Sequence, residues 1–282
     1  MTYDPSRRRP GRRPRLTRRG RLVLMMGAVL VIAVAVLVPV LVERGSDGPG
    51  PATLVVPEGR RAAQVYASVD RVLGMPAGTT REKAASVPLD LPETAGDNPE
   101  GYLFPATYPV DSESTPASLL SFMVNTANQR LGDHRVSTGA QLHHVTVYQA
   151  VTIASIVQAE AATATDMGKV ARVIHNRLAR GMALQMDSTI NYALNRSSLD
   201  TTYQDTGVDS PYNTYERKGL PPTPIGNPGD EALDAAVHPT RGNWLYFVTV
   251  APGDTRFTDS FAEQQRNVAE FNANRRAASR SS

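Results

Sequence analysis

The chain has 282 residues, of which 41% are hydrophobic and 20% charged, so it is long enough for a folded domain with additional segments. It contains no cysteine, which excludes disulfides, thiolate catalysis and cysteine-ligated metal centres. Nine of the 30 basic residues but only one of the 27 acidic residues precede residue 22. The rest of the chain is therefore net acidic, and the overall charge of +3 does not predict a nucleic-acid partner.

The first element in chain order is an uncharged apolar run at residues 22–42, LVLMMGAVLVIAVAVLVPVLV. As a helix it would span about 30 Å, the thickness of a bilayer's hydrocarbon core, so we predict a single transmembrane helix. A cleaved signal peptide is the alternative, but the run is longer than the usual apolar region and no small-residue cleavage motif follows it. Nine arginines precede the run and only Arg44 follows it closely. This asymmetry predicts a single-pass protein of the cell membrane, with a cytoplasmic basic tail at 1–21 and an extracytoplasmic remainder.

A small βα subdomain is predicted after the membrane helix. Residues 43–53 are rich in glycine and proline and predict a short linker. TLVVPEG at 53–59 predicts a strand and turn, and the apolar spacing over 62–73 predicts an amphipathic helix. We therefore assign residues 54–96 to this subdomain and its connector.

The main domain is predicted at residues 97–272. Its predicted elements are helices at 115–131, 146–162 and 166–180, a buried strand at 245–250 and a last helix at 262–276. Thr146 and Gln149 form a capping box at the start of the second helix, and Asp166 and Gly181 are the expected N-cap and stop of the third. Helices and strands alternate without regular βαβ repeats, which favours the α+β class. Residues 273–282 are predicted as a disordered tail.

Glu160 closes the apolar segment ASIVQAE of the second helix. At about 100° per residue it points to the same side as Ile153, whereas Gln158 is expected to face solvent. A buried carboxylate is costly unless it is paired or protonated. One interpretation is therefore an ion pair with Arg172 or Arg177. The other is a carboxyl group whose pKa is raised, so that it can act as a general acid.

Polar and aromatic side chains are concentrated in QMDSTINY at 185–192 and in SPYNTY at 210–215. Amides and hydroxyl groups bind sugar hydroxyls, and aromatic rings cover sugar faces, so both segments predict a carbohydrate site. Its candidate residues are Gln185, Asp187, Ser188, Thr189, Tyr212, Asn213 and Tyr215. The alternative for Asp187 is a structural role, in which it caps a turn or orients Asn176.

Several segments resemble, in order and spacing, the MltG-type (YceG-like) endolytic murein transglycosylases: VVPEG, PEGYLFPATY, IASIVQAEA, KVARVIHNRLARGMALQMDSTINYAL, SPYNTYERKGLPPTPIGNPGDEALDAA and LYFV. The resemblance implies a bitopic membrane enzyme with a LysM-like N-terminal subdomain. Such an enzyme cleaves the bond between N-acetylmuramic acid (MurNAc) and N-acetylglucosamine (GlcNAc) inside peptidoglycan strands and leaves 1,6-anhydro-MurNAc ends. Glu160 falls on the family's catalytic glutamate, and no cofactor or metal is implied.

The same resemblance implies a mechanism and a setting. Glu160 protonates the glycosidic oxygen and then accepts the proton of the MurNAc C6 hydroxyl while that oxygen attacks C1. Action near the membrane on newly made strands is implied, with peptidoglycan synthases as candidate partners. Two positions depart from the family pattern: Ala106 stands where the family has Asp, and TRF at 255–257 replaces HTF. The sugar contacts of these two positions are therefore not carried over.

Two other functions are compatible with parts of the sequence. A noncatalytic, membrane-tethered scaffold would bind peptidoglycan or its synthesis machinery, with Glu160 in a buried ion pair. A metal enzyme would use His143, His144 and Glu160, although adjacent histidines before a helix usually point apart. Turnover of uncrosslinked glycan strands distinguishes an enzyme from a scaffold.

Overall fold

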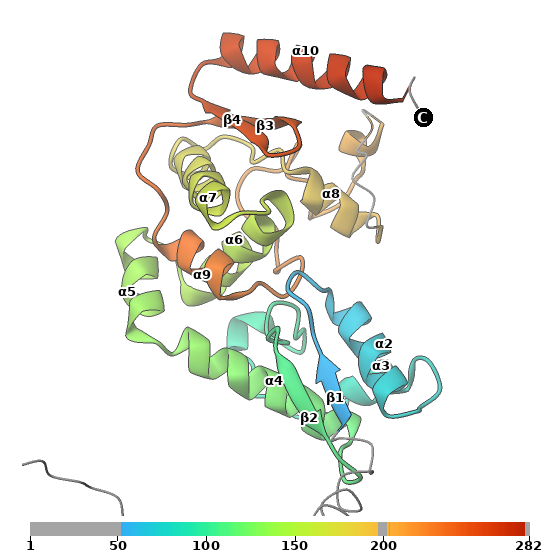
Figure 1. Ribbon diagram of the computed structural model, residues 1–282. Coiled ribbons are helices and arrows are strands. Elements are labelled where there is room, and N and C mark those ends of the chain that lie inside the picture. Colours follow the sequence, from blue (N-terminus) through green and yellow to red (C-terminus); the bar gives the residue numbers. More distant parts are fainter. Residues whose placement is uncertain (1–51, 197–201, 203, 280–282) are drawn as a thin grey trace, which may run out of the picture. The chain divides into compact units, whose positions relative to one another are not determined.

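The computed structural model describes residues 52–196, 202 and 204–279 (Figure 1). The predicted membrane helix and basic tail lie outside the described residues, as does most of the predicted linker, so these assignments stay predictions. No helix of the described residues is long and apolar enough to cross a membrane.

The N-terminal region, residues 52–131, combines an antiparallel sheet with helices that pack beside it. The sheet pairs β1 (Ala52–Val55) with β2 (Thr107–Val110) and places Leu54 opposite Tyr108. The other elements are α2 (Ala62–Val72), α3 (Thr79–Ala84), the 3-10 helix η1 (Glu93–Ala95) and α4 (Pro116–Leu131). α2 packs on β1, and α4 packs on α2 and α3. The helices predicted at 62–73 and 115–131 are confirmed.

β2 and α4 belong to the segment predicted as the main domain, yet both pack within the N-terminal region. The pairing of β1 with β2 joins residues far apart in the sequence, and no local pattern reports such a pairing. The predicted limits at 54–96 and 97–272 stay predictions, whereas the contacts group residues 52–131 together.

The centre of the remaining chain is α6 (Val147–Glu160), which lies among other helices in Figure 1. All residues from Ala150 to Val157 are buried, as expected of a helix that is apolar on every side. α6 packs against α5 (His134–Leu142), α7 (Ala164–Ala179), α8 (Asp187–Ala193) and α9 (Asp230–Val237). The 3-10 helix η2 (Asp205–Gly207) lies between α8 and α9 in the sequence.

The helix ends test the predicted caps. The capping box of α6 is confirmed, because Thr146 Oγ1 accepts the Gln149 N–H at 3.1 Å and Gln149 Oε1 accepts the Thr146 N–H at 2.9 Å. The predicted N-cap of α7 is wrong, since Thr163 caps this helix by accepting the Asp166 N–H at 3.2 Å. Asp166 lies instead in the first turn, where the helix dipole favours a negative charge. Gly181 follows α7 with a φ of +62°, as its predicted role as a stop requires.

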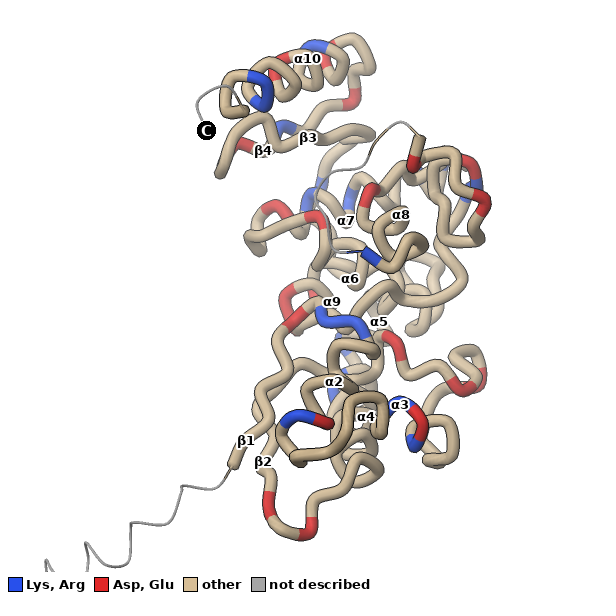
Figure 2. The backbone as a smooth tube through the Cα atoms, turned by 90° about the vertical axis from the view of Figure 1, so that its right-hand side faces the viewer, with Lys and Arg blue, Asp and Glu red and all other residues tan. Residues whose placement is uncertain are grey.

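The C-terminal part is a β-hairpin against which the last helix packs. β3 (Tyr246–Ala251) pairs with β4 (Asp254–Thr258), and α10 (Phe261–Ala278) packs on β3. Arg256 of β4 forms ion pairs with Asp254 and with Glu270 of α10, which link the hairpin to the helix. Residues of both charges occur along the hairpin and along α10 (Figure 2). The predicted strand at 245–250 and helix at 262–276 are confirmed. Because α10 continues to Ala278, the predicted disorder is wrong for residues 273–278.

Helices and antiparallel strands occur together in the described residues, and β1–β2 and β3–β4 form separate sheets. This arrangement confirms the predicted α+β class.

Candidate active site

Glu160 is the last residue of α6, and its carboxyl group lies beside the first turn of α8. The Ser188 N–H donates a hydrogen bond to Glu160 Oε1 at 3.1 Å. α8 begins at Asp187, so this residue also lies beside the contact. The Glu160 side chain is half-buried, which leaves it partly exposed to a ligand.

The surroundings of Glu160 favour the protonated carboxyl group. Burial raises its pKa, because protein surrounds the group on most sides and disfavours the charged form. The hydroxyl and backbone N–H of Ser188 lower the pKa, and the negative charge of Asp187 raises it. The net direction is upward, so Glu160 keeps its proton to a higher pH than an ordinary glutamate.

The two arginines considered as partners of Glu160 bind other groups. Arg172 donates to backbone carbonyl oxygens in the loop after α9, and Arg177 donates to carbonyl oxygens after α7 and just before β3, all at 2.6–3.1 Å. Within the described residues, Glu160 makes no ion pair. The interpretation of Glu160 as an ion-paired carboxylate is therefore wrong.

Arg177 organises the segment that carries Gln185, a role that we did not predict. Its side chain is 6% exposed, and it donates to the carbonyl oxygens of Leu184 and Leu245, both at 2.6 Å. Gln185 has a φ of +50° and an exposed side chain, so the backbone turns sharply at the point that Arg177 holds. The sequence contained one signal for this role. Arg177 follows Ile174 by three residues, which places it on the apolar face of α7.

Asp187 and Tyr215 form a hydrogen-bonded pair next to Glu160. The Tyr215 hydroxyl donates to Asp187 Oδ1 at 2.5 Å, and both side chains are half-buried. The proposed orientation of Asn176 by Asp187 is wrong, because the Asn176 amide donates to backbone carbonyl oxygens near β3. The structure thus brings Asp187, Ser188 and Tyr215 together with Glu160.

Two of the predicted substrate contacts are buried instead. Thr189 has no exposed surface, and its hydroxyl donates to the Met186 carbonyl at 2.7 Å. Asn213 is equally buried, and its amide donates to backbone carbonyl oxygens of Thr206 and Val208. Because their polar atoms are already bound inside the protein, both residues shape the loops of the site and do not present atoms to a sugar. The structure therefore corrects the prediction that Thr189 and Asn213 contact the substrate directly.

Tyr212 contacts residues other than Glu160, Asp187, Ser188 and Tyr215. The Tyr212 hydroxyl shares a hydrogen bond of 2.8 Å with Thr223 in the proline-rich loop at residues 221–228, PPTPIGNP. Its ring is tilted against the ring of Tyr192, with 4.8 Å between the ring centres. Tyr212 is half-buried, so part of its surface remains available beside the loop.

Gln158 does not face solvent as expected. Its Oε1 accepts the Gly229 N–H at 3.0 Å, and a side chain at Gly59 would touch it. Gln158 therefore lies between the start of α9 and the turn after β1. We predicted the direction of Gln158 on the assumption that only one face of α6 is covered. Other segments of the protein cover the opposite face as well.

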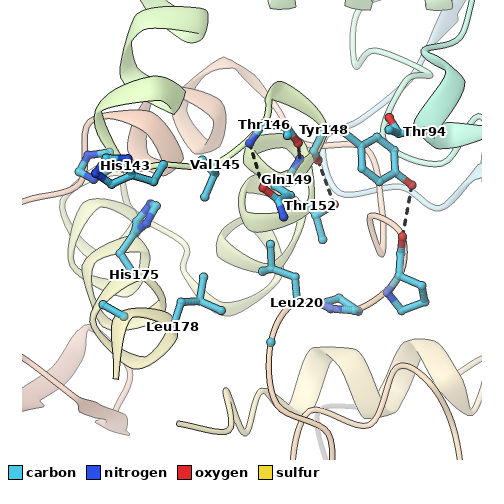
Figure 3. A pocket seen from close by; sticks show the side chains of 15 residues that line it. Thr94, His143, Val145, Thr146, Tyr148, Gln149, Thr152, His175, Leu178 and Leu220 are labelled. Carbon is cyan, nitrogen blue, oxygen red and sulfur yellow. Dashed lines mark hydrogen bonds between the residues drawn. The ribbon is translucent and has the colours of Figure 1, made fainter. Parts of the chain in front are cut away.

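A cavity of about 760 Å³ lies at the other end of α6 (Figure 3). His143, His144 and His175 line it together with Leu220 and neighbouring prolines, and Glu160 does not. The 14 residues of α6 span about 20 Å, so His143 and His144 lie near one end of the helix and Glu160 at the other. The described residues contain no group of three metal-ligating side chains. The metal site considered for these three residues is therefore not formed in this structure.

Glu160 is a partly exposed carboxyl group with a raised pKa and polar neighbours, and these are properties that a general acid requires. The sequence model of the YceG-like family matches residues 35–270, so the chain belongs to this family.

Named relatives agree with this membership. An endolytic murein transglycosylase of Bacillus subtilis strain 168 is 36% identical over 168 residues, which are 59% of this chain and 46% of that protein. One of Streptococcus pneumoniae strain D39 is 36% identical over 177 residues, which are 61% of this chain and 32% of that protein. A crystal structure of a yceG-like protein from Listeria monocytogenes shares 32% identity at a TM-score of 0.69 and covers 77% of this chain and 75% of that one. The match spans less than half the length of the two transglycosylases.

Proposed function

We propose that the protein is an endolytic peptidoglycan lytic transglycosylase that cleaves MurNAc–GlcNAc bonds within glycan strands. The observation that carries the proposal is Glu160, a partly exposed carboxyl group whose pKa is raised and which binds no cation among the described residues. Membership in the YceG-like family and the names of the two transglycosylase relatives support the same reaction.

A single carboxyl group is sufficient for this chemistry. Neutral Glu160 donates its proton to the glycosidic oxygen as the bond from that oxygen to MurNAc C1 breaks. The resulting carboxylate then accepts the proton of the C6 hydroxyl, while the C6 oxygen forms a new bond to C1 and closes the 1,6-anhydro ring. The nucleophile belongs to the substrate and is already close to C1, so neither water nor a second enzyme carboxylate has to attack. Glu160 ends the cycle protonated.

The neighbouring residues support distinct parts of this reaction. Asp187 favours the protonated form of Glu160 through its charge, and Tyr215 holds Asp187 in place through its hydroxyl. Gln185 is exposed on the adjacent turn and is the residue that we assign to sugar hydroxyls.

The membrane setting is part of the proposal. Residues 22–42 would anchor the chain, and the linker at 43–53 would reach at most about 40 Å when extended. The catalytic site would then work on glycan close to the membrane, where newly made strands and the synthases that make them are found. A variant that lacks residues 1–42 should be recovered without detergent, whereas the full chain should remain with membranes.

Product analysis on uncrosslinked glycan strands tests the reaction. Wild type should release fragments that end in 1,6-anhydro-MurNAc, detected by mass spectrometry. Glu160→Gln should reduce the rate by at least about 100-fold, because a positioned acid contributes roughly 10²–10⁴-fold. Glu113→Gln changes an exposed glutamate in the N-terminal region and serves as the matched control, with activity unchanged.

The outcomes separate the alternatives. Mostly reducing MurNAc ends would make the protein a hydrolase. No cleavage by wild type, together with binding to the strands, would favour the noncatalytic scaffold. A fully active Glu160→Gln variant would refute the assignment of the acid.

A further inference from the structure

Glu100 is a second buried acid, and it lies outside the site described above. It is 4% exposed. The Ala62 N–H at the start of α2 donates to its Oε1 at 2.8 Å, and the Tyr192 hydroxyl of α8 donates to its Oε2 at 3.1 Å. The Asn227 amide also donates to Oε1, at 3.3 Å. One carboxyl group therefore joins α2, α8 and the loop before α9.

Asn227 completes this junction and has no exposed surface. Its amide donates to the Arg60 carbonyl at 2.7 Å, and its Oδ1 accepts the Leu103 N–H at 2.8 Å. Its backbone N–H also donates to the Arg60 carbonyl, at 3.0 Å. The turn after β1, the segment after Glu100 and the loop before α9 are thus held together by the hydrogen bonds of a fully buried residue.

α8 connects this junction to Glu160. Ser188 in its first turn binds Glu160, and Tyr192 four residues later binds Glu100. Ser188 donates through its backbone N–H at the start of the helix and Tyr192 through its side chain near the end, so the seven residues of α8 bridge the two acids. The guanidinium group of Arg61 covers the Tyr192 ring, 5.0 Å from its centre, and fixes it further.

We propose that Glu100 is a positioning residue of the active site. By accepting the hydrogen bond of Tyr192 while it holds the start of α2, Glu100 fixes α8 so that Asp187 and Ser188 stay beside Glu160. The N-terminal region is thereby coupled to Glu160 through Glu100 and the short helix α8. The kinetic part of this inference rests on the proposed function, whereas the coupling of Glu100 to α8 does not.

The charge of Glu100 makes the coupling depend on pH. Burial raises the pKa of Glu100 to about 7, although the hydrogen bonds from Ala62 and Tyr192 and the charge of Arg61 lower it. Tyr66 and Tyr192 are further ionisable groups that face it. The carboxylate accepts hydrogen bonds with both oxygens, whereas the neutral acid carries a proton on one of them. The bond from Tyr192 is charge-assisted only in the ionised form, so it should be stronger above this pKa than below it.

Tyr192→Phe is the most selective test, because it removes the donor to Glu100 and retains the aromatic ring. At a pH above the Glu100 pKa, amide hydrogen exchange in a peptide that covers residues 187–193 should become about tenfold faster, as expected for the loss of one hydrogen bond to a charged group. Exchange in α7 should not change. Glu100→Leu should have the same effect on α8.

Glu100→Gln is the conservative variant. Its carbonyl oxygen can accept from Ala62 and Asn227, and its amide can donate to the Tyr192 oxygen. It should therefore keep α8 protected, but without the change in protection that wild type shows as the pH passes through about 7.

Asp70→Asn is the matched control. Asp70 is a buried acid of the same region, 3% exposed, and it binds Gly78 and Thr80 at the start of α3. This variant should speed exchange in α3 and leave α8 unchanged. It separates loss of stability in the N-terminal region from loss of the contact to α8.

Kinetics on uncrosslinked strands supply the functional readout. Tyr192→Phe should lower kcat about tenfold and leave KM unchanged, because it disturbs the acid's surroundings and removes no predicted substrate contact. Unchanged α8 exchange in Tyr192→Phe, or equal effects of Asp70→Asn on α8, would overturn the inference. Should wild type cleave no glycan, the proposed function fails, and the exchange results alone still decide whether Glu100 holds α8.

Discussion

Asp70 in the N-terminal region and Glu160 at the end of α6 are both carboxyl groups within folded surroundings, yet their pKa values shift in opposite directions. Burial raises the pKa of Asp70, but hydrogen bonds from the Thr80 hydroxyl at 2.6 Å and from the N–H groups of Thr80 and Gly78 at 2.8 Å outweigh it. For Glu160, burial outweighs the hydrogen bonds from Ser188, and the negative charge of Asp187 acts in the same direction as burial, so its pKa rises.

Glu100 shows which difference matters. It accepts hydrogen bonds from as many groups as Asp70 does, yet its pKa is raised to about 7 because it is deeply buried. Both groups are almost fully buried, but the hydrogen bonds to Asp70 measure 2.6–2.8 Å and those to Glu100 2.8–3.3 Å. Burial and the strength of the hydrogen bonds together decide whether a carboxyl group is a structural anion or a proton donor. Among the described residues Glu160 accepts a hydrogen bond from Ser188 alone, so the effect of burial prevails.

The largest expected change in stability concerns Asp70. Asp70→Ala leaves the N–H groups of Gly78 and Thr80 and a hydroxyl without their acceptor, and should lower the free energy of unfolding by about 3 kcal/mol at neutral pH. Urea unfolding measures this difference. Since the folded pKa of Asp70 is lowered, the difference should shrink as the pH falls below the usual aspartate value of 3.8. Asp97→Ala, at an exposed aspartate of the same N-terminal region, is the control with little change.

The same variant tests the comparison with Glu160. Within the described part of the chain Asp70 accepts hydrogen bonds from Gly78 and Thr80, both at the start of α3, so Asp70→Ala should leave the pH dependence of glycan cleavage as it is in wild type. A shifted pH profile would mean that the two carboxyl groups are coupled, and the contrast drawn above would not hold.

Asp187→Asn should change the pH profile more than the stability. Without the charge of Asp187, the pKa of Glu160 should fall toward that of an ordinary glutamate, so the acid loses its proton at lower pH. The alkaline limb of the kcat profile should therefore move to lower pH, and activity should persist under acidic conditions in which Glu160→Gln has none. Glu216→Gln removes an exposed charge beside Tyr215 and serves as the control. If the alkaline limb of the kcat profile does not move in Asp187→Asn, the charge of Asp187 does not raise the pKa of Glu160.

The sequence was sufficient to predict the features that local patterns encode. The capping box at Thr146 and the periodicity of α6 predicted a helix with Glu160 on a buried side, and both came from residues within a few turns. The segment after α7 was predicted to contribute Asp187 and Ser188 to substrate binding, which stays a prediction, and the structure places both residues beside Glu160.

Contacts between distant segments could not be predicted in this way. Arg177 was a plausible partner of Glu160 by its place on the next helix, but carbonyl oxygens as far away as Leu245 occupy its guanidinium group. Thr189 and Asn213 are polar residues within candidate segments, and only the packing of those segments shows that they are buried. The contact of Glu100 with Tyr192 joins residues 92 positions apart, and no periodicity reports it.

Ser188→Ala should give the smallest change, with a sign opposite to that of Asp187→Asn. The Ser188 hydroxyl lowers the pKa of Glu160, although it makes no hydrogen bond of regular geometry within the described residues. Removing it should raise this pKa and move the alkaline limb of the kcat profile to higher pH. The backbone N–H of residue 188 still donates to Glu160, so the shift should be modest and the fold retained. Opposite shifts in the two variants would show that the limb reports Glu160. A shift to lower pH in Ser188→Ala would assign the limb to another group.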